Sequence, residues 1–255
     1  RLAVAAADAA LGTVMQVGGV VRARSIEQRG GEIVLAGGAS GVVHVDGVLD
    51  VSNASGGIGG TVKVLGERVG LVGAARIDAS GDSGGGTVLV GGNYQGKGPE
   101  ANASRTVVGS EAVIDASARA QGDGGKVIVW SDDTTAYTGT ILARGGAQGG
   151  NGGFVEVSGK KRLHFDGEAD LRAPRGAAGR LLLDPMNLTI GTTADLNGDG
   201  DPMTNDDLVS SPLLSGDFGG ATSQITANRV AMLLATGDVT LQATSRIDVT
   251  APLTV

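Results

Sequence analysis

The segment Gly59-Gly60-Thr61-Val62-Lys63-Val64 is a pair of glycines followed by a run in which every second residue is valine. The same pattern, a glycine step before alternating apolar residues, occurs six times along the chain. The other copies are Gly30–Leu35, Gly85–Val90, Gly124–Val129, Gly152–Val157 and Gly179–Leu183. Alternation with a period of two is typical of β-strands, and the glycines before each run indicate tight turns. Because the pattern recurs, it predicts a stack of equivalent strands.

The glycine pairs that begin at residues 30, 59, 85, 124 and 152 are separated by 29, 26, 39 and 28 residues. The long interval contains Asn93–Arg105, a polar insertion that we expect to be a loop. A second motif keeps the same period, in Leu49–Ser52, Ile77–Ser80 and Ile114–Ser117, and a short apolar stretch such as Val69–Val72 lies between the two motifs. Each period of about 27 residues thus holds three short strands. This predicts an all-β fold, a right-handed parallel β-helix with three strands in each coil, where a coil is one turn of the solenoid.

Alternation assigns the two faces of the strands in the glycine-stepped runs. The side chains expected to point inward form two aliphatic ladders: Ile33/Leu35, Val62/Val64, Val88/Val90, Val127/Val129, Val155/Val157 and Leu181/Leu183. Those expected to point outward are Val34, Lys63, Leu89, Ile128, Glu156 and Leu182. Because several of the outward residues are apolar, we expect a neighbouring element or a partner to cover part of this face.

Two segments interrupt the strand pattern. Ala5–Met15 is rich in alanine, and Ile225–Thr236 has a helical apolar stripe with Thr226 as its N-cap, so short helices are expected in both. The whole chain, 1–255, is predicted to be one β-helix segment. Its expected parts are an entry coil with a helix (1–30), regular coils (31–190), a polar loop insertion (191–222), and a helix with further coils (223–255).

Composition excludes several classes of function. The net charge is −7, which argues against a nucleic-acid partner, because such a partner requires a basic face. The chain has no cysteine, so disulfides, thiolate chemistry and Cys-ligated metals are excluded. Only two histidines are present, and no Gly-x-Ser-x-Gly elbow occurs. We therefore expect a protein that is not an enzyme.

Five runs of the chain resemble the filamentous-haemagglutinin-like exoproteins of bacterial two-partner secretion. They are Val21–Glu27, Gly85–Lys97, Gly124–Asp133, Gly152–Lys160 and Leu181–Ile190. The resemblance covers nearly the whole chain. It implies a long right-handed β-helix, export through a dedicated outer-membrane pore, and a secreted or cell-surface role in adhesion, biofilm or contact-dependent interaction. The family's amino-terminal secretion domain is not in this sequence, so the chain is expected to be shaft that follows that domain.

The strongest candidate metal site is the acidic loop that starts at Asp195. Oxygen ligands alternate along it with a glycine at the sharp turn, as in an EF-hand loop, and Asp206 stands at position 12 when Asp195 is position 1. The candidate Ca²⁺ ligands are Asp195, Asn197, Asp199, Asp201 and Asp206. Asp is shorter than the usual Glu at position 12, and Pro202 breaks the pattern. A solvated acidic loop therefore stays open as the alternative to a bound Ca²⁺.

Asp50, Asp78 and Asp115 occupy equivalent positions in the second motif, so we expect their carboxylates to stack on adjacent coils. Like charges about 5 Å apart repel. The aspartates are therefore expected to cap turn amides, to pair with arginines, or to hold cations. The candidate partners are Arg76, Arg144 and Arg172. A row of carboxylates on a β-helix is also compatible with a polysaccharide lyase or hydrolase, for which a nearby arginine or lysine in one solvent groove is the expected sign.

Both histidines occur in a His-x-Asp pattern, His44/Asp46 and His164/Asp166, and alternation places them on the outside as surface residues. The aromatic side chains that would stack on sugar rings, if exposed, are those of Trp130, Tyr94 and Tyr137. The leading hypothesis is a structural and adhesive shaft. Its expected partners are the secretion pore, other copies packed end to end or laterally, and host or matrix glycans. A polysaccharide-binding module and a polysaccharide-degrading β-helix enzyme are the alternatives.

Overall fold

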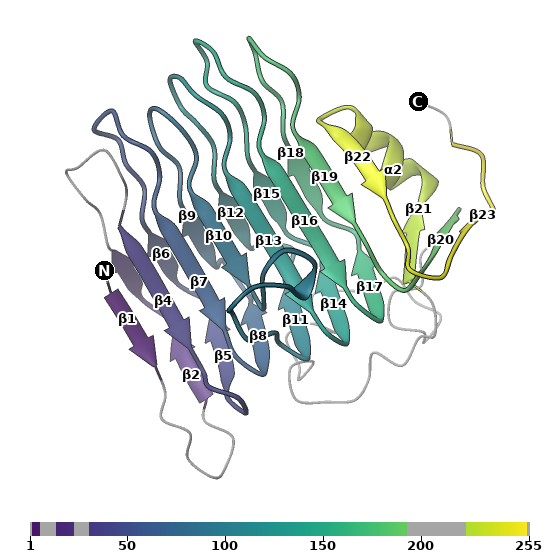
Figure 1. Cartoon of the computed structure of the whole chain (residues 1–255), viewed down its shortest axis with the longest axis horizontal. Coiled ribbons are helices and arrows are strands. Elements are labelled where there is room, and N and C mark those ends of the chain that lie inside the picture. Colours follow the sequence, from purple (N-terminus) through teal and green to yellow (C-terminus); the bar gives the residue numbers. More distant parts are fainter. Residues whose placement is uncertain (1, 6–13, 23–30, 193–222, 254–255) are drawn as a thin grey trace.

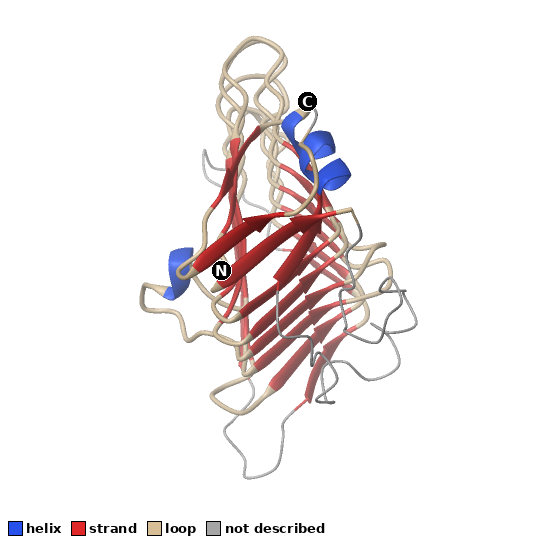
Figure 2. Cartoon of the chain, turned by 90° about the vertical axis from the view of Figure 1, so that its right-hand side faces the viewer, coloured by secondary structure: helices blue, strands red, loops and turns tan. Residues whose placement is uncertain are grey.

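The computed structural model describes residues 2–5, 14–22, 31–192 and 223–253, and it consists mainly of short parallel strands in three sheets. Figure 1 shows the strands in rows along the long axis, and Figure 2, which looks along that axis, shows the sheets around a common interior. All strand pairs within the three sheets are parallel. The structure thus confirms the all-β, parallel β-helical class.

From β1 to β20, successive strands of the chain belong to successive sheets, which we call A, B and C. Sheet A contains β1 (Leu2–Ala5), β4 (Glu32–Ala36), β7 (Thr61–Leu65), β10 (Thr87–Val90), β13 (Lys126–Ser131), β16 (Phe154–Gly159), β19 (Arg180–Leu183) and β22 (Asp238–Leu241). Sheet B contains β2 (Val14–Val17), β5 (Val42–Val45), β8 (Arg68–Leu71), β11 (Arg105–Val108), β14 (Thr134–Tyr137), β17 (Arg162–Phe165), β21 (Ser223–Thr226), β20 (Asn187–Gly191) and β23 (Arg246–Val249). Sheet C contains β3 (Val20–Arg22), β6 (Val48–Asp50), β9 (Arg76–Asp78), β12 (Val113–Asp115), β15 (Thr140–Leu142) and β18 (Glu168–Asp170).

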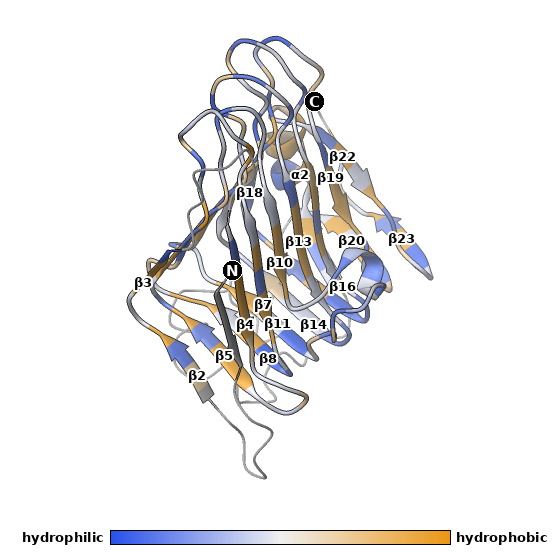
Figure 3. Cartoon of the chain, turned by 60° about the vertical axis from the view of Figure 1, so that its left-hand side comes forward, coloured by the Kyte–Doolittle hydropathy of each residue, from blue (hydrophilic) through white to orange (hydrophobic). Residues whose placement is uncertain are grey.

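The glycine-stepped valines lie in register on neighbouring strands of sheet A. Val62 pairs with Val88, and Val88 pairs with Val127, with all strands parallel. The predicted inward ladders are buried, from Ile33 to Leu183, and they belong to one core that runs through the molecule. In Figure 3 hydrophobic residues are concentrated in the strands, whereas the tips of the loops that protrude beside sheet A are largely hydrophilic.

These protruding loops leave sheet C and return to sheet A, and they stack on one another (Figure 1, top). We call them the lobes; they comprise residues 51–60, 79–86, 116–125, 143–153 and 171–179. Backbone bonds join one lobe to the next, for example from the N–H of Arg119 to the oxygen of Gly81 (2.8 Å). The base of a lobe is closed by the glycine step, since Gly125 N–H donates to the oxygen of Ala116 (2.7 Å). A Cβ on Gly125 would overlap the backbone oxygen of Gly86, which explains the need for glycine there.

The insertion predicted at Asn93–Arg105 contains a short 3₁₀ turn, η1 (Tyr94–Gly96), and passes in front of sheet A (Figure 1, in front of β13). Beneath it, the outward-facing residues Leu89 and Ile128 form a second apolar cluster with Trp130, against which Phe154 packs. The expectation that a neighbouring element covers this face is confirmed here. Because of this cover, Leu89, Ile128 and Glu156 are buried although they point away from the main core.

The C-terminal part departs from the regular order of strands. In sheet B, β21 lies between β17 and β20, although β20 comes first in the sequence. Helix α2 (Ala227–Leu234) follows β21 and contacts β18, the last strand of sheet C. The N–H of Leu171, just after β18, donates to the oxygen of Thr236 (3.0 Å). The segment that ends the helix thus takes the place that the next strand of sheet C would occupy.

The two expected helices have different outcomes. The second is confirmed as α2, with Thr226 as N-cap, whose hydroxyl accepts a hydrogen bond from the Arg229 N–H (3.0 Å). It is shorter than predicted, because Ile225 and Thr226 belong to β21. At the first, Ala5 belongs to β1 and Val14–Met15 to β2, so helix was the wrong prediction for the two ends of that segment. Residues 6–13 lie outside the described ranges.

Candidate functional site

The aspartates of the second motif form a row on the outer face of sheet C. Asp78 in β9 pairs in register with Asp50 in β6 on one side and with Asp115 in β12 on the other. The row continues through Leu142 in β15 to Asp170 in β18. Neighbouring strands lie about 4.8 Å apart, so the predicted stacking of Asp50, Asp78 and Asp115 is confirmed.

Each of these aspartates ends its strand by capping the turn that follows. One carboxylate oxygen accepts the backbone N–H two residues further on. The distances to Asp50, Asp78, Asp115 and Asp170 are 3.0 Å from Ser52, 3.1 Å from Ser80, 2.9 Å from Ser117 and 3.2 Å from Arg172. Asp side chains favour turns through this local bond, which replaces a lost strand partner. The expectation of turn capping is therefore confirmed.

Arginines supply the counter-charges, as expected for Arg76, Arg144 and Arg172. Arg76 lies 3.9 Å from the Asp78 carboxylate and 3.8 Å from that of Asp115. Arg172 binds Asp170 with two N–H groups, at 2.9 and 2.7 Å, and Arg144 lies 4.0 Å from the same carboxylate. Burial alone would raise the pKa of Asp170, but the hydrogen bonds from Arg172 and the nearby charges hold that pKa below its ordinary value.

A fourth arginine belongs to this group and was not predicted. Arg119 reaches from the lobe that follows β12 back to the preceding repeat, where it lies 3.8 Å from the Asp78 carboxylate and donates to the Ser80 hydroxyl (2.7 Å). The sequence of the repeat that contains Arg119 does not predict this contact, because Asp78 is distant in the sequence. The stacking of the lobes brings the two residues together.

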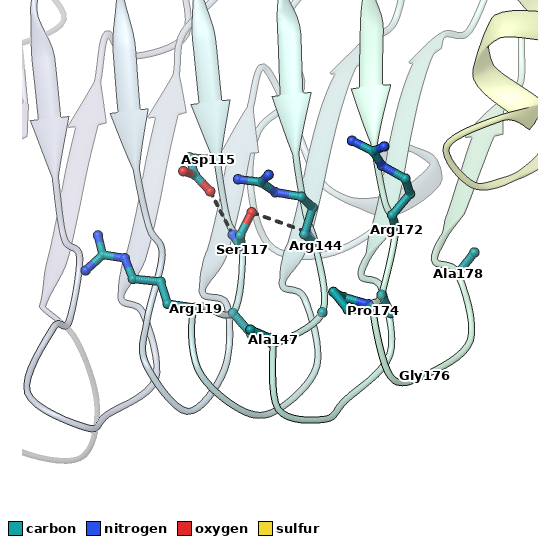
Figure 4. A pocket seen from close by; sticks show the side chains of 12 residues that line it. Asp115, Ser117, Arg119, Arg144, Ala147, Arg172, Pro174, Gly176 and Ala178 are labelled. Carbon is teal, nitrogen blue, oxygen red and sulfur yellow. Dashed lines mark hydrogen bonds between the residues drawn. The ribbon is translucent and has the colours of Figure 1, made fainter.

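Three of these arginines, Arg119, Arg144 and Arg172, line a hollow of about 820 Å³ where sheet C meets the lobes (Figure 4). We call it the arginine groove. Its charged lining residues are Asp115, Arg119, Arg144 and Arg172, and the rest of the lining is mainly alanine and glycine with Pro174. The three arginine side chains keep 40%, 47% and 64% of their surface exposed. They therefore retain N–H donors that face solvent.

A smaller hollow of about 360 Å³ extends the arginine groove toward α2. The two hollows share Arg172, and the second also touches Asp170 and, from the helix, Arg229 and Met232. Arg229 is held by Asp166, with 2.9 Å between the guanidinium and the carboxylate. Charged side chains of both signs thus continue to the end of sheet C.

The aspartates beside the arginine groove are engaged in turns and ion pairs, whereas its guanidinium groups remain partly exposed. A glycoside hydrolase needs two carboxyl groups free to exchange protons with the substrate. Here each aspartate already accepts a turn amide with one oxygen, and Asp78 and Asp170 have arginines at the other. Guanidinium groups with exposed N–H donors bind carboxylates, sulfates and phosphates with matching geometry.

The structure corrects one of the two histidine predictions. His164 in β17 is fully buried, not on the surface, and it stands in register between Ala136 of β14 and Gln224 of β21. His44 in β5 is half-buried. Alternation correctly placed both histidine side chains on the face of the sheet that points away from the main core. An outward position alone does not decide whether solvent reaches a side chain.

The aromatic residues proposed to stack on sugars are mostly covered. Trp130 is 4% exposed beneath the insertion, and its indole N–H donates to the Asp132 carboxylate (3.2 Å). Tyr137 is fully buried in the main core, where its ring stacks on Phe165 at 5.6 Å. Only Tyr94 of the three, at 37%, is substantially exposed. Sugar stacking on Trp130 or Tyr137 is therefore wrong for this fold.

A buried carboxylate that the sequence did not predict as special lies beneath the insertion. Glu156 in β16 is fully buried, and its oxygens accept the backbone N–H of Gln95 at 3.1 and 3.3 Å. The pKa of Glu156 is raised to about 7, mainly by burial and in smaller part by the nearby Asp184, against the lowering effects of the hydrogen bonds from Gln95 and Ser158 and of the charge of Lys126. The sequence feature that could have indicated this burial is the outward position of Glu156 beside the apolar Ile128, because an apolar outward residue indicates a covered face.

The predicted Ca²⁺ ligands Asp195, Asn197, Asp199, Asp201 and Asp206 lie outside the described residues. Within the described ranges, no three His, Asp or Glu side chains are grouped so that they could hold a metal ion. In the same part of the chain, no helix has the length and apolar character needed to cross a membrane. Comparison of the sequence with protein-family models and with curated proteins finds no match.

Proposed function

We propose that this chain is a shaft segment of a secreted bacterial surface protein of the filamentous-haemagglutinin-like type, and that it acts in adhesion, biofilm or filament formation. The finer description of the fold belongs to the same proposal: a right-handed solenoid with three strands in each coil. Right-handed crossovers are the strong preference of parallel strands joined through other elements. The regular assignment of β4 to β18 to sheets A, B and C in turn supports three strands per coil.

The observation that carries the proposal is the unbroken row of registered aliphatic residues through sheet A. Each repeat buries its inner face against the other strands of its own coil and against the repeats before and after it. Stability in such solenoids is close to a sum of repeat and neighbour terms, so length can be added without redesign. A protein built in this way holds distal parts at a distance from its anchor, which is the mechanical task of a shaft.

The proposed partners follow from this role. An outer-membrane pore of a two-partner system would export the chain, and other copies would pack against it end to end or laterally. Host or matrix glycans are the proposed ligands. The net charge of −7 makes a nucleic-acid partner unfavourable.

Two measurements test the proposal. The parent protein should be found outside its bacterium or on the cell surface, by immunolabelling of intact cells and by protease accessibility. Beads that carry the purified chain should adhere to host cells or matrix more than beads that carry Gly125→Val, which is designed to disrupt the solenoid. A parent protein confined to the cytosol, or equal adhesion of the two kinds of bead, would contradict the proposal.

Glycan binding is the second candidate function, and the arginine groove favours it over glycan degradation. The groove combines one carboxylate, that of Asp115, with arginines in one solvent channel, but this carboxylate is engaged in a turn and an ion pair. Incubation of the chain with uronate polysaccharides should therefore leave their length unchanged. Shortened products that disappear with Asp115→Asn would revive the enzyme alternative.

A further inference from the structure

We propose that Lys63 and Asn93 react with each other to form an isopeptide bond, an amide between the lysine Nζ and the side-chain carbonyl carbon of the asparagine. Glu100 carries the proton that this reaction has to move. The bond ties the insertion, residues 93–105, covalently to strand β7 of the preceding repeat. This inference goes beyond the proposed shaft function and does not depend on it, because the modification is read directly in the mass of the chain.

The three side chains meet on the outer face of sheet A. Lys63 belongs to β7, Asn93 stands just before η1 at the start of the insertion, and Glu100 lies further along it. The Glu100 carboxylate bridges the other two groups. One of its oxygens accepts a hydrogen bond from Lys63 Nζ at 2.8 Å, and the other accepts one from Asn93 Nδ2 at 2.7 Å. A single carboxylate thus holds an amine and an amide side by side, and such positioning favours a reaction between them.

The side-chain amide of Asn93 is held in a way that activates it toward attack. Its Oδ1 accepts a hydrogen bond from the backbone N–H of Tyr94 at 2.7 Å. When an amine adds to Cγ, negative charge develops on this oxygen, and a donor already in place stabilises that charge. The nitrogen of the same amide, which is the leaving group, is bound to Glu100. Asn93 therefore has a donor at its oxygen and a proton carrier at its nitrogen.

The surroundings of Lys63 decide how readily its amine becomes neutral. The Glu100 side chain is 8% exposed and that of Lys63 is 27% exposed, and Lys63 stands in register between the apolar residues Val34 and Leu89. Desolvation disfavours separate charges and so favours transfer of the proton from the ammonium to the carboxylate. At rest the pair is ionic, because the hydrogen bond from Lys63 holds the pKa of Glu100 below its ordinary value even though burial opposes this. The neutral pair is a minor state, and bond formation is therefore slow.

The reaction balances without any further reactant. Glu100 takes a proton from the Lys63 ammonium, and the neutral Nζ attacks Cγ of Asn93. As the bond between Cγ and Nδ2 breaks, Glu100 gives this proton to the leaving nitrogen, which departs as ammonia. The attacking nitrogen then releases its second proton to the Glu100 carboxylate, and the ammonia carries that proton away. An ammonium group and an amide thus become one new amide and one ammonium ion, with no oxidation or reduction.

The bond has a structural consequence for the insertion. The insertion covers the cluster of Leu89, Ile128 and Trp130, and it is held to the sheet by hydrogen bonds and packing. A covalent link to β7 keeps its base in place when these contacts loosen. It also closes a loop of chain between residues 63 and 93, which restricts the unfolded state and so favours the folded one.

Mass spectrometry of the purified full chain, after several days at neutral pH, tests the proposal. The intact chain should be lighter than its sequence requires by the mass of one ammonia molecule. Trypsin should release a branched peptide made of residues 30–68 and 77–97, because it cannot cleave after a modified Lys63. A folded chain that keeps its full sequence mass after this incubation would overturn the proposal.

Two variants show which residues are responsible. Lys63→Arg keeps a positive charge beside Glu100 but offers no amine, and Glu100→Gln keeps the shape without the proton carrier, so each should abolish the mass loss completely. The matched control is Lys161→Arg, in which a lysine 3.4 Å from the Asp133 carboxylate is replaced, and it should show the full mass loss. A mass loss that persists in Lys63→Arg would overturn the proposal, because asparagine also loses ammonia when it forms a cyclic imide. Circular dichroism establishes that the variants are folded, and the branched peptide from the natural chain gives the answer even for a variant that does not fold.

Discussion

The replacement Glu156→Gln tests the energetic cost of the carboxylate buried beneath the insertion. The Glu156 oxygens face the Gln95 N–H, with Lys126 near enough to favour the charge and Asp184 near enough to oppose it. Burial raises the pKa of Glu156 from 4.5 to about 7, so the folded protein binds this proton more tightly than the unfolded chain. Glutamine keeps the shape and an acceptor for the Gln95 N–H, but it carries no charge.

The linkage between proton binding and folding determines how the stability changes with pH. A raised pKa in the folded state means that the contribution of Glu156 to stability is fully present below about pH 4.5. It is lost as the pH rises through about 7. The difference between the two pKa values corresponds to about 3 kcal/mol, an upper value because the site can relax. We therefore expect Glu156→Gln to match the natural chain near pH 5 and to exceed its free energy of unfolding by up to about 3 kcal/mol at pH 8.

Urea unfolding at pH 5 and pH 8 measures this difference. The chain has a single tryptophan, Trp130, and it lies beneath the same insertion, so its fluorescence reports local opening while circular dichroism reports the strands. Glu111→Gln is the matched control, since Glu111 is exposed in a turn. A stability difference between Glu156→Gln and the natural chain that is the same at both pH values would refute the reasoning.

The remaining predictions concern the core and the glycine steps. Tyr137→Phe should leave the free energy of unfolding unchanged or raise it by about 1 kcal/mol at most, so the melting temperature should not fall. The reason is that the buried hydroxyl has no hydrogen-bond partner among the described residues, while the stacking on Phe165 is kept. A clear fall in melting temperature would contradict this. Gly125→Val should destabilise the chain by about 3 kcal/mol or more, because its Cβ overlaps the oxygen of Gly86 in the adjacent repeat. The matched control, Gly19→Ala, has open space around the new methyl group and should melt like the natural chain.

Local pattern was sufficient to predict the architecture of the regular repeats. The alternation in runs such as Gly85–Val90 specified which side chains are buried in the main core, because the strand period of two leaves no other assignment. The spacing of the glycine steps predicted which runs would be neighbours, and the register of Val62 with Val88 and Val127 confirms it. The turn caps of Asp78 and Asp115 also follow from sequence, because an aspartate bonds to an amide only two residues away.

Only the tertiary structure determined which segments cover the outer faces of the sheets and which side chains contact one another between repeats. Alternation placed Glu156, Ile128 and His164 away from the main core, yet all three are buried. The insertion covers the first two, and their burial depends on a loop that starts more than thirty residues earlier in the sequence. The arginine groove has the same origin, since Arg119 meets Asp78 only because one lobe stacks on another.

The order of strands in the C-terminal part was likewise beyond sequence pattern. Strand β21 enters sheet B between β17 and β20, and the segment that ends α2 takes the place of the next strand of sheet C. A strand pattern predicts that a segment joins a sheet, but it does not predict which strand it pairs with. The reason is that every parallel sheet edge offers the same backbone donors and acceptors. Side-chain packing among distant segments makes that choice. It is a property of the folded chain, and no single repeat contains it.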